Sequence, residues 1–303
     1  MIVAFGNPVY DYIQTPVVTT GERVLSGCST NACLALGRLG HTTILVGRVG
    51  DDYRVRFMRD AERYGVVADM QSCEQTGGFQ LMYNDRGERT LDVLGVAAPI
   101  NHGVDRCADA QAIIIGPILQ ETPVSLIEQI YKASDAPLVL DPQGLLRQIN
   151  PSGRIEHVLP SSFSRIAPLF HVIKANELET KIITGIDPRE DGRAAARRLK
   201  DLGCSIAIVT LAEAGSIIDD GTRQYFIPPF ATDACDPTGA GDTYMAGFLH
   251  AFLHNPHDLY IAGCYGSATA SIWIEHTGPD APVTLSEVER RVDVLLEQSG
   301  RNV

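Results

Sequence analysis

Short apolar segments alternate along this chain with segments whose apolar residues repeat at helical spacing. The apolar segments are rich in β-branched residues and end near Gly, Asp or Asn, as buried strands do. Several helical segments are followed by a glycine, which favours helix termination. Strands and helices that alternate in this way form a parallel sheet with helices on both faces. The expected strands are 2–5, 43–46, 112–115, 138–140, 172–173 and 206–209, and the expected helices are 31–39, 55–64, 123–133, 177–184 and 193–202.

Two stretches interrupt this alternation and are predicted to form a small β-flap. Residues 12–25 contain β-forming residues around a Thr20-Gly21 turn, and residues 78–94 alternate around Asn84-Asp-Arg-Gly87, a hairpin signal. We expect the flap to be a lid inserted in a single domain that spans residues 1–303. The alternative is that both stretches are ordinary edge strands.

The composition is that of an ordinary globular chain. It has 303 residues, 45% hydrophobic and 20% charged, with a net charge of −12. The length is ample for a core, and the acidic balance makes a nucleic-acid partner a poor expectation. The seven cysteines are scattered without a Cys-x-x-Cys pair, which favours reduced thiols over disulfides or a zinc site. The N-terminus runs directly into an apolar strand, so we expect a cytoplasmic protein with no signal peptide and no membrane span.

The most specific motif is a glycine-rich turn before an apolar helix, Asp-Pro-Thr-Gly-Ala-Gly-Asp at 236–242. Glycine lets a ligand approach the backbone, and the free N–H groups and dipole at a helix start attract an anion such as phosphate. Asp242 would repel that phosphate, unless its task is to take a proton from a hydroxyl that attacks the phosphate. The alternative is that Asp242 caps the helix. The turn lacks the Gly-Lys-Ser/Thr of a Walker P-loop, and Tyr244 stands where a dinucleotide fingerprint needs a small residue.

The run from Asp236 to Tyr244 resembles the second signature of the ribokinase/PfkB family of carbohydrate kinases, Asp-Thr-x-Gly-Ala-Gly-Asp-x-Phe. The order of the other motifs agrees with that family from residue 11 to residue 278. The resemblance implies a ribokinase-like α/β fold, a three-layer sandwich with a central, mostly parallel sheet and a small lid. It further implies an ATP-dependent kinase in which Asp242 is the catalytic base. The backbone of Gly239, Ala240 and Gly241 would then form the anion hole for the transferred phosphoryl group.

Two N-terminal segments match positions that hold substrate hydroxyls in the family. Asp11 follows the first strand, and Ser26-Gly27-Cys-Ser-Thr-Asn31 precedes the first long helix. The resemblance therefore implies that Asp11, Gly27 and Asn31 bind the substrate, although Ser26 replaces the first glycine of the family's Gly-Gly-x-x-x-Asn. Without the family, these residues would be interpreted as turn and helix caps.

The strand 138–140 is followed by Asp141-Pro-Gln143-Gly, which is expected to line the crevice at the carboxyl ends of the strands. Gln143 is expected to contact the substrate, and it departs from the Asp-x-Asn that family members often have.

Asn176-Glu-Leu-Glu179 follows the strand 172–173 and matches the family's Asn-x-x-Glu. By itself the pattern predicts an N-cap with a capping box. The resemblance implies that Asn176 and Glu179 organise Mg²⁺ and the phosphates, mainly through water, as suits an ion that keeps several waters. A monovalent cation is a further ligand that the resemblance leaves open.

Other segments match the family's ATP-binding region. The turn after strand 206–209 is similar to its Thr-x-Gly-x-x-Gly, with Ala212 in place of the first glycine, and 263–278 resembles the helix and turn beside the adenine. The alternative for the latter is close helix packing through small residues. The residues expected to bind ATP are Asn176, Thr210, Ala212, Gly215, Thr238, Gly239, Gly241 and Ser271.

Three histidines, His250, His254 and His257, cluster at a helix end that Asn255-Pro256 interrupts. We interpret them as a solvated helix end rather than a metal site.

The acceptor is the least determined property. The short flap and the segments 141–144 and 276–279 resemble short-lidded members that act on inositol, related sugars or sugar acids. A nucleoside kinase is the alternative, since Tyr10, Tyr12, Phe79 and Tyr83 could form a slot for a base. A non-catalytic sugar-binding regulator is a third hypothesis. We predict a carbohydrate kinase, monomeric or homodimeric, that phosphorylates a small sugar or polyol, with ATP rather than another donor as the expected phosphoryl source.

Overall fold

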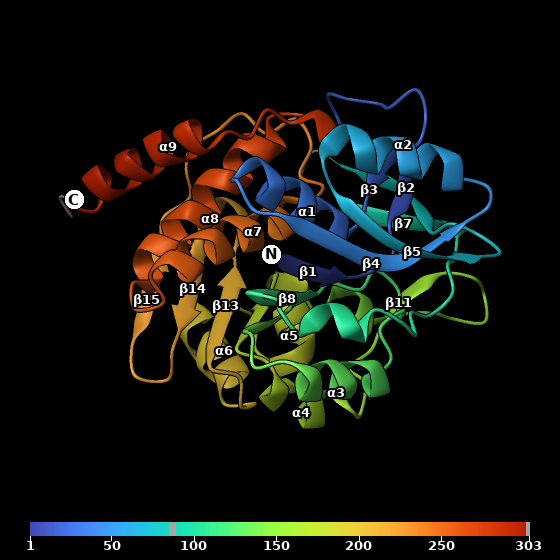
Figure 1. Cartoon of the computed structure of the whole chain (residues 1–303). Coiled ribbons are helices and arrows are strands. Elements are labelled where there is room, and N and C mark those ends of the chain that lie inside the picture. The colour runs from blue at the N-terminus through green and yellow to red at the C-terminus, as the bar shows by residue number, and fades with distance from the viewer. Residues whose placement is uncertain (85–88, 301–303) are drawn as a thin grey trace.

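The computed structural model describes residues 1–84 and 89–300, and its centre is a nine-stranded sheet between two layers of helices (Figure 1). Neighbouring strands are parallel except at β13–β14 and β14–β15. This arrangement confirms the expected three-layer sandwich with a mostly parallel sheet. In spatial order the strands are β15 (Gln224–Ile227), β14 (Ser216–Asp219), β13 (Ile206–Thr210), β12 (Val172–Ala175), β9 (Leu138–Leu140), β8 (Ala112–Ile115), β1 (Ile2–Phe5), β4 (Thr43–Gly50) and β5 (Val67–Cys73).

Alternate residues of the strands feed two separate hydrophobic cores, because successive side chains of a strand point to opposite faces. In β1, Ile2 and Ala4 belong to one core, and Val3 and Phe5 belong to the other. The first core packs under α1 (Cys28–Arg38), α2 (Arg54–Tyr64), α7 (Ala240–His254), α8 (Leu259–Ile274) and α9 (Leu285–Gln298). The second packs under α3 (Val124–Ala133), α4 (Phe163–Ile166), α5 (Glu177–Thr184) and α6 (Gly192–Lys200).

All six expected strands and all five expected helices are present, and β1, β8, β9 and α5 have the predicted ends. The largest shift is at β4, which continues to Gly50 instead of ending at Val46. α1 begins three residues early at Cys28, so Asn31 lies inside the helix instead of starting it. The strand and helix patterns did not predict β5 or α8, and a helix in the region of α8 was expected only from the family resemblance of 263–278. β5 is an edge strand whose Val67 is half exposed, so it lacks a continuous apolar run. α8 is apolar nearly all round because it is buried on most sides, so its sequence lacks amphipathic periodicity.

A second sheet has the strand order β3 (Val24–Ser26), β2 (Val9–Gln14), β6 (Gly78–Tyr83), β7 (Arg89–Gly95) and lies to the right in Figure 1. Its strands come from the two stretches that were expected to form the flap. β2 begins at Val9, so Asp11 lies within a strand of this sheet. The predicted hairpin turn at 84–87 lies outside the described residues beyond Asn84. A two-stranded ribbon, β10 (Arg147–Ile149) and β11 (Ile155–His157), completes the strands of the described chain.

The two faces of the flap sheet have different partners. β2 and β6 run parallel with Tyr12 opposite Gln80, which places Asp11 level with Phe79 and on the same face. Tyr10 lies on the other face, where it stacks on Tyr53 with ring centroids 4.3 Å apart. Its hydroxyl donates to the Asp60 carboxylate of α2 at 2.6 Å. Tyr10 and Tyr12 therefore face away from Asp11.

The histidine cluster is only in part the solvated helix end that we expected. His250 is buried, and its Nδ1 lies 2.9 Å from Nε2 of His41, whereas His254 and His257 are exposed. Burial, with His41 as a second cause, lowers the pKa of His250 to about 4, so the ring is neutral near pH 7. The pair joins the end of α7 to the turn between α1 and β4. The sequence pattern did not include His41, which lies 209 residues away.

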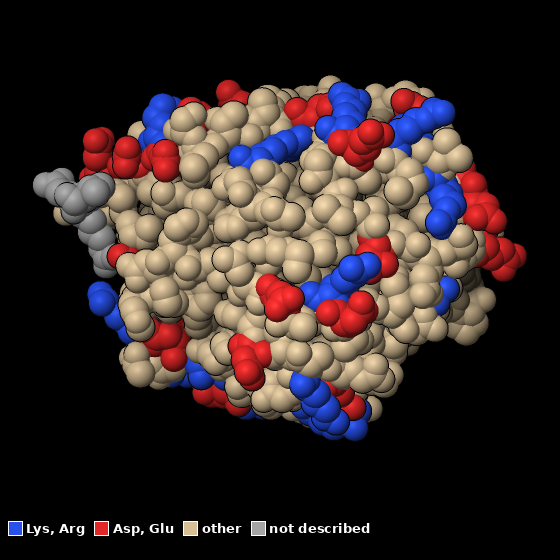
Figure 2. Space-filling model, viewed as in Figure 1, with Lys and Arg blue, Asp and Glu red and all other residues tan. Residues whose placement is uncertain are grey.

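Charge on the molecular surface is mixed. On the face shown in Figure 2, Lys and Arg side chains lie beside Asp and Glu side chains, and much of the middle of that face is neither. In the part of the chain that the structure describes, no helix is long and apolar enough to span a membrane.

The turn after β13 contains a strained residue. Ala212, which replaces the family's glycine, has a φ of 47°, in the left-handed region that favours glycine. The turn closes through a hydrogen bond from the Leu211 amide to the Gly215 carbonyl at 2.8 Å. The glycine-like backbone is thus kept although the side chain has changed.

We predict that Ala212→Gly stabilises the protein. Relief of the left-handed strain exceeds the added chain entropy of glycine by roughly 0.5–1 kcal/mol. The measurement is the free energy of unfolding in urea. Ala214→Gly is the matched control, because Ala214 lies in the same turn with an ordinary φ, and this variant should be less stable than the wild type by roughly 0.5–1 kcal/mol. Equal destabilisation of both variants would contradict the prediction.

Candidate active site

The candidate site lies at the carboxyl ends of the central parallel strands. The chain leaves β1 toward β4 on one side and returns to β8 on the other, which makes a topological switch point beside β1. Asn7 follows β1, Gly116 follows β8, Asp141 follows β9 and Asn176 follows β12. Polar residues from segments far apart in the sequence therefore meet at one edge of the sheet.

Asp242 enters this edge from the first turn of α7. The N-cap residue of α7 is Gly239, with a φ of 83°, so the alternative that Asp242 caps the helix is wrong. The half-buried Asp242 instead accepts a hydrogen bond at Oδ2 from Nδ2 of Asn31 at 2.9 Å. The structure thus brings together two predicted site residues, one from α1 and one from α7, that are 211 positions apart.

The glycines of the turn are required by close packing. A methyl group on Gly239 would lie 2.7 Å from Nε1 of Trp273, and one on Gly241 would lie 2.5 Å from Nζ of Lys174. Trp273 also donates from Nε1 to the carbonyl of Thr238 at 3.0 Å, which fixes the turn from below. Side chains at 239 and 241 would displace these groups.

Two residues beside Asp242 were not identified from the sequence. Lys174 of β12 is buried, and its Nζ lies 2.5 Å from Oδ2 of Asp141, which is buried as well. The sulfur of Cys28 and the carboxylate oxygens of Asp141 and Asp242 all lie within 4.8 Å of one another. Lys174 could have been identified from the sequence, because a lysine is unusual within an apolar strand that is predicted to be buried. Cys28 had no such signal, because it looks like any small core residue.

The electrostatics of this cluster shift several pKa values. Burial, followed by the charge of Asp141, raises the pKa of Asp242, although Lys174 and the Asn31 hydrogen bond oppose the shift. The same two causes raise the pKa of Glu179. Burial disfavours the ammonium of Lys174, but the carboxylates of Asp141, Glu179 and Asp242 outweigh it and raise its pKa. Burial raises the pKa of Cys28 well above its usual range, so its thiol is neutral.

Asn176 and Glu179 form the capping box that the sequence pattern predicts. The Asn176 side chain accepts from the Glu179 amide at 2.9 Å, and the Glu179 carboxylate accepts from the Asn176 amide at 2.9 Å. Each oxygen of a carboxylate can accept more than one hydrogen bond, so this geometry still leaves acceptor capacity at Glu179.

The residues that were expected to bind the substrate lie in the flap and at the start of α1. Oδ1 of the buried Asp11 accepts from the amide of Phe79 at 2.7 Å. Gly27 is the N-cap of α1 with a φ of 120°, and a methyl group there would lie 3.1 Å from the Asn7 carbonyl oxygen. A small cavity beneath the flap is lined by Asn7, Val9, Phe79, Val96, Ile118 and Glu121 among others. The sequence analysis missed Asn7 and Glu121.

Gln143 is linked to a buried arginine. Its amide oxygen accepts from Nη2 of Arg147 at 2.7 Å, and its backbone amide donates to Oδ1 of Asp141 at 3.0 Å. Gln143 therefore lies one hydrogen bond away from the Lys174–Asp141 pair.

The predicted ATP-binding residues fall into three groups. Thr238, Gly239 and Gly241 belong to the turn at the start of α7. Thr210, Ala212 and Gly215 lie at the end of β13 and in its turn, on the same sheet edge as Asn176. Ser271 is buried between helices: its hydroxyl donates to the Ala268 carbonyl at 2.7 Å and accepts from Nη1 of Arg291 at 2.9 Å. Its hydroxyl thus serves the packing of α8 on α9, as the alternative of close helix packing suggested.

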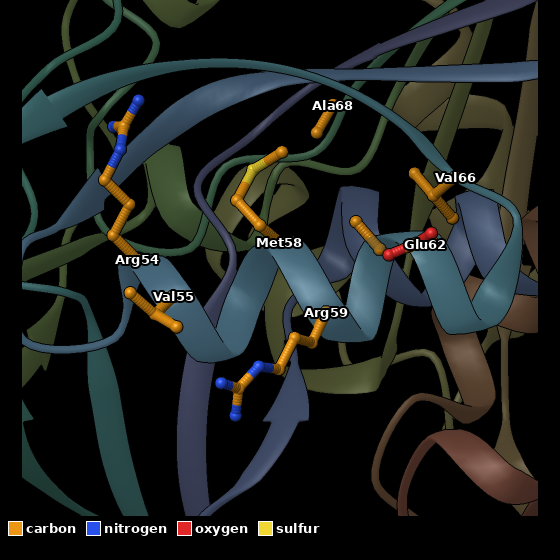
Figure 3. Close-up of a pocket in the computed structure, with 8 residues that line it drawn as sticks. Arg54, Val55, Met58, Arg59, Glu62, Val66 and Ala68 are labelled. Atoms are coloured by element: carbon orange, nitrogen blue, oxygen red, sulfur yellow. The ribbon is translucent and has the colours of Figure 1, made fainter.

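A separate groove of about 590 Å³ lies on α2 and β5 (Figure 3). Met58, Val66 and Ala68 contribute apolar groups to it, and Arg54 and Glu62 flank them. None of the predicted site residues lines this groove, so the candidate active site is the cluster around Asp242.

Comparisons with known proteins identify the family of this chain. Residues 1–285 match the family described as pfkB family carbohydrate kinase. The chain is 24% identical over 243 residues to a deoxyribokinase of Salmonella typhi, covering 76% of this chain and 74% of that protein. A pyrophosphate-dependent kinase in the ribokinase family, complexed with a pyrophosphate analog and myo-inositol, superposes with a TM-score of 0.81 at 21% identity, covering 96% of this chain and all of the other.

A nucleoside kinase of Burkholderia thailandensis, in complex with ADP and inosine, also superposes with a TM-score of 0.81 at 21% identity, covering 98% of this chain and 96% of that one. The solved structures share the ribokinase-like fold with this chain. The family match extends over nearly all of its length, and the chain belongs to the pfkB family of carbohydrate kinases.

Proposed function

We propose that this kinase transfers the γ-phosphoryl group of ATP to a hydroxyl of a small sugar, an inositol or a sugar acid, with Asp242 as general base. The observation that carries the proposal is the position of Asp242. Its carboxylate is half-buried, is held by Asn31 and stands at the start of a helix whose Gly239 and Gly241 pack closely against Trp273 and Lys174. A base and an anion site are thus adjacent, as transfer from a phosphate to a hydroxyl requires.

The geometry supports a defined orientation of the Asp242 carboxylate. Asn31 donates to its Oδ2, and Cys28 is a second hydrogen-bonding neighbour, so the acceptor hydroxyl meets a carboxylate that is held in place. The raised pKa makes Asp242 a stronger base than an exposed aspartate. The backbone amides of Gly239, Ala240 and Gly241 and the dipole of α7 stabilise the charge that develops on the transferring group.

The residues present fit the Mg²⁺ that the family implies. The three buried or half-buried carboxyl groups of Asp141, Glu179 and Asp242 share the ammonium of Lys174, so their ionised forms leave an excess of negative charge. Asn176 and Glu179 would hold the ion through water, in keeping with its preference for a few carboxylates and several waters. When bound, the ion neutralises charge on the phosphates of the donor.

The flap supports acceptor binding and exclusion of water. Asp11 faces inward beside Phe79, where its carboxylate can accept from a substrate hydroxyl. Tyr83 and Thr238 are linked by a hydrogen bond of 3.0 Å between their hydroxyls, and the Thr15 hydroxyl donates to the Cys235 carbonyl at 2.9 Å. These contacts join the flap to the catalytic turn. Closure of the flap is therefore coupled to the conformation of the turn.

A nucleoside acceptor is the second candidate. The face of the flap that carries Asp11 also presents the apolar side chains of Ile13, Phe79 and Leu81, which suit a nucleobase better than a fully hydroxylated ring. Tyr10 and Tyr12, which were expected to contribute to a base slot, lie on the opposite face of the flap. The slot would thus rest on Phe79 and Tyr83 alone among the four aromatics.

We predict that Asp242→Asn lowers kcat by about 10³-fold or more, because the amide cannot accept the acceptor's proton, while acceptor affinity changes little. The measurements are steady-state kinetics and calorimetric titration of the acceptor. Asp293→Asn, the same change on an exposed position of α9, is the matched control and should retain wild-type kcat. Near-normal turnover of the Asp242 variant would refute the base role.

The pH dependence of kcat/KM should report the raised pKa of Asp242. A base works only when ionised, so activity is complete above its pKa and is lost as the pH falls through it. Because that pKa is raised, the acid limb should lie above about 3.9, the ordinary value of an aspartate. Asn31→Ala removes a hydrogen bond that lowers the pKa and should move the limb further toward neutral pH. A limb that stays in place in this variant would contradict the assignment.

A panel of sugars, inositols, sugar acids and nucleosides, tested with ATP and with pyrophosphate as donors, identifies the substrates. We expect turnover with ATP and a polyol or sugar acid, and we expect Asp11→Ala to raise the KM of that acceptor about 100-fold with little change in the KM of ATP. Preference for a nucleoside would select the second candidate. Turnover with pyrophosphate but not with ATP would identify pyrophosphate as the donor in place of ATP.

A further inference from the structure

Lys174 has a position that the mechanism above does not explain. It lies in β12, in the middle of the sheet, and its side chain is 3% exposed. A lysine is almost never buried to this extent unless it is paired, because removing the ammonium from water costs several kcal/mol. A hydrophobic side chain would serve the sheet at lower cost, so the charge calls for a reason at the active site.

The ammonium of Lys174 lies between the end of β9 and the start of α7. Its Nζ is 2.5 Å from Oδ2 of Asp141. On the other side, a methyl group at Gly241 would lie 2.5 Å from the same Nζ, so the ammonium is packed directly against the glycine turn. The salt bridge to Asp141 therefore holds a positive charge beneath the backbone that the phosphoryl group is proposed to meet.

The charge balance of the surroundings makes this cation important. The chain carries a net charge of −12, and Asp141, Glu179 and Asp242 all act on Lys174 electrostatically. Without Lys174, these carboxylates would repel an anionic donor that approaches the α7 turn. The helix dipole would then be the main attraction that opposes this repulsion. A dipole end is equivalent to roughly half an elementary charge, so a full positive charge a few ångströms away is the larger attraction.

We propose that Lys174 is the fixed cation of the anion site: its ammonium, held beneath Gly241 by Asp141, draws the anionic end of the phosphoryl donor to the α7 turn. The inference deepens the proposed function and rests on it, since it assigns the donor's phosphates to that turn. Lys174 acts through the turn, as a positioning residue for the donor. The competing explanation is that Lys174 only neutralises Asp141.

The test compares two variants in which Asp141 is already replaced by a neutral side chain, Asp141→Asn and Asp141→Asn/Lys174→Met. They differ only in the charge of Lys174, and the pair avoids leaving Asp141 buried without its cation. The probe is inorganic pyrophosphate, whose dissociation constant is measured by calorimetry without any acceptor, so that the result does not depend on turnover. Thermal unfolding of each variant verifies that it is folded.

We expect Asp141→Asn to bind pyrophosphate at least as tightly as the wild type, and the double variant to bind it about tenfold more weakly or worse. Lys181→Met is the matched control, because Lys181 is an exposed lysine of α5 paired with Asp187, and its loss should change the dissociation constant less than about twofold. Equal affinities of the single and the double variant would show that Lys174 only neutralises Asp141. Failure of the wild type to bind pyrophosphate would overturn the proposal as well.

Failure of the proposed kinase function can be distinguished from failure of the proposed role of Lys174. If the protein binds pyrophosphate in a Lys174-dependent way but phosphorylates no acceptor of the panel, the proposed anion site stands and the proposed kinase function is rejected. If the double variant still turns over with an unchanged KM for the donor, the proposed kinase function stands and the proposed role of Lys174 is rejected.

Discussion

The buried ion pair between Lys174 and Asp141 holds the candidate site together. It joins the ends of two neighbouring parallel strands, β12 and β9, and places an ammonium against the first turn of α7. Asp242 and Glu179 lie in the field of the same ammonium, and burial first and then the charge of Asp141 raise the pKa of both. Without the lysine, three carboxyl groups would compete for ionisation in a poorly solvated space.

The sheet makes this crowding possible. Its strands bury both faces in separate cores, and the polar residues of the candidate site gather at the carboxyl ends, where the loops after β1, β8, β9 and β12 converge. The flap uses its two faces differently. One carries Asp11 and Phe79, and the other packs on α2 through Tyr10. Because side chains alternate along a strand, a single residue of register decides which groups face the acceptor.

Local patterns predicted much of this organisation. The alternation of strands and helices indicated the layers of the sandwich, and the capping box at Asn176 and Glu179 was visible from residue spacing alone. Patterns failed where burial is unusual. Uniformly apolar α8 has no periodicity to detect, and the partner of His250 is His41, far away in the sequence. Ala212 is a further case, because it has a left-handed backbone conformation that favours glycine although it is an alanine.

The kind of reaction could be inferred from the amino-acid sequence without coordinates. The turn at 236–242 combines glycines, a helix start and one carboxylate within a few residues, which alone also fits a helix cap, and its resemblance to the family signature indicated the reaction. The surroundings of that carboxylate became known from the folded chain alone: Asn31 on one oxygen, Cys28 and Asp141 nearby, and the ammonium of Lys174 below the turn. These neighbours come from α1, β9 and β12. Electrostatic interactions depend on distances in space, which chain folding sets and which sequence separation does not reveal.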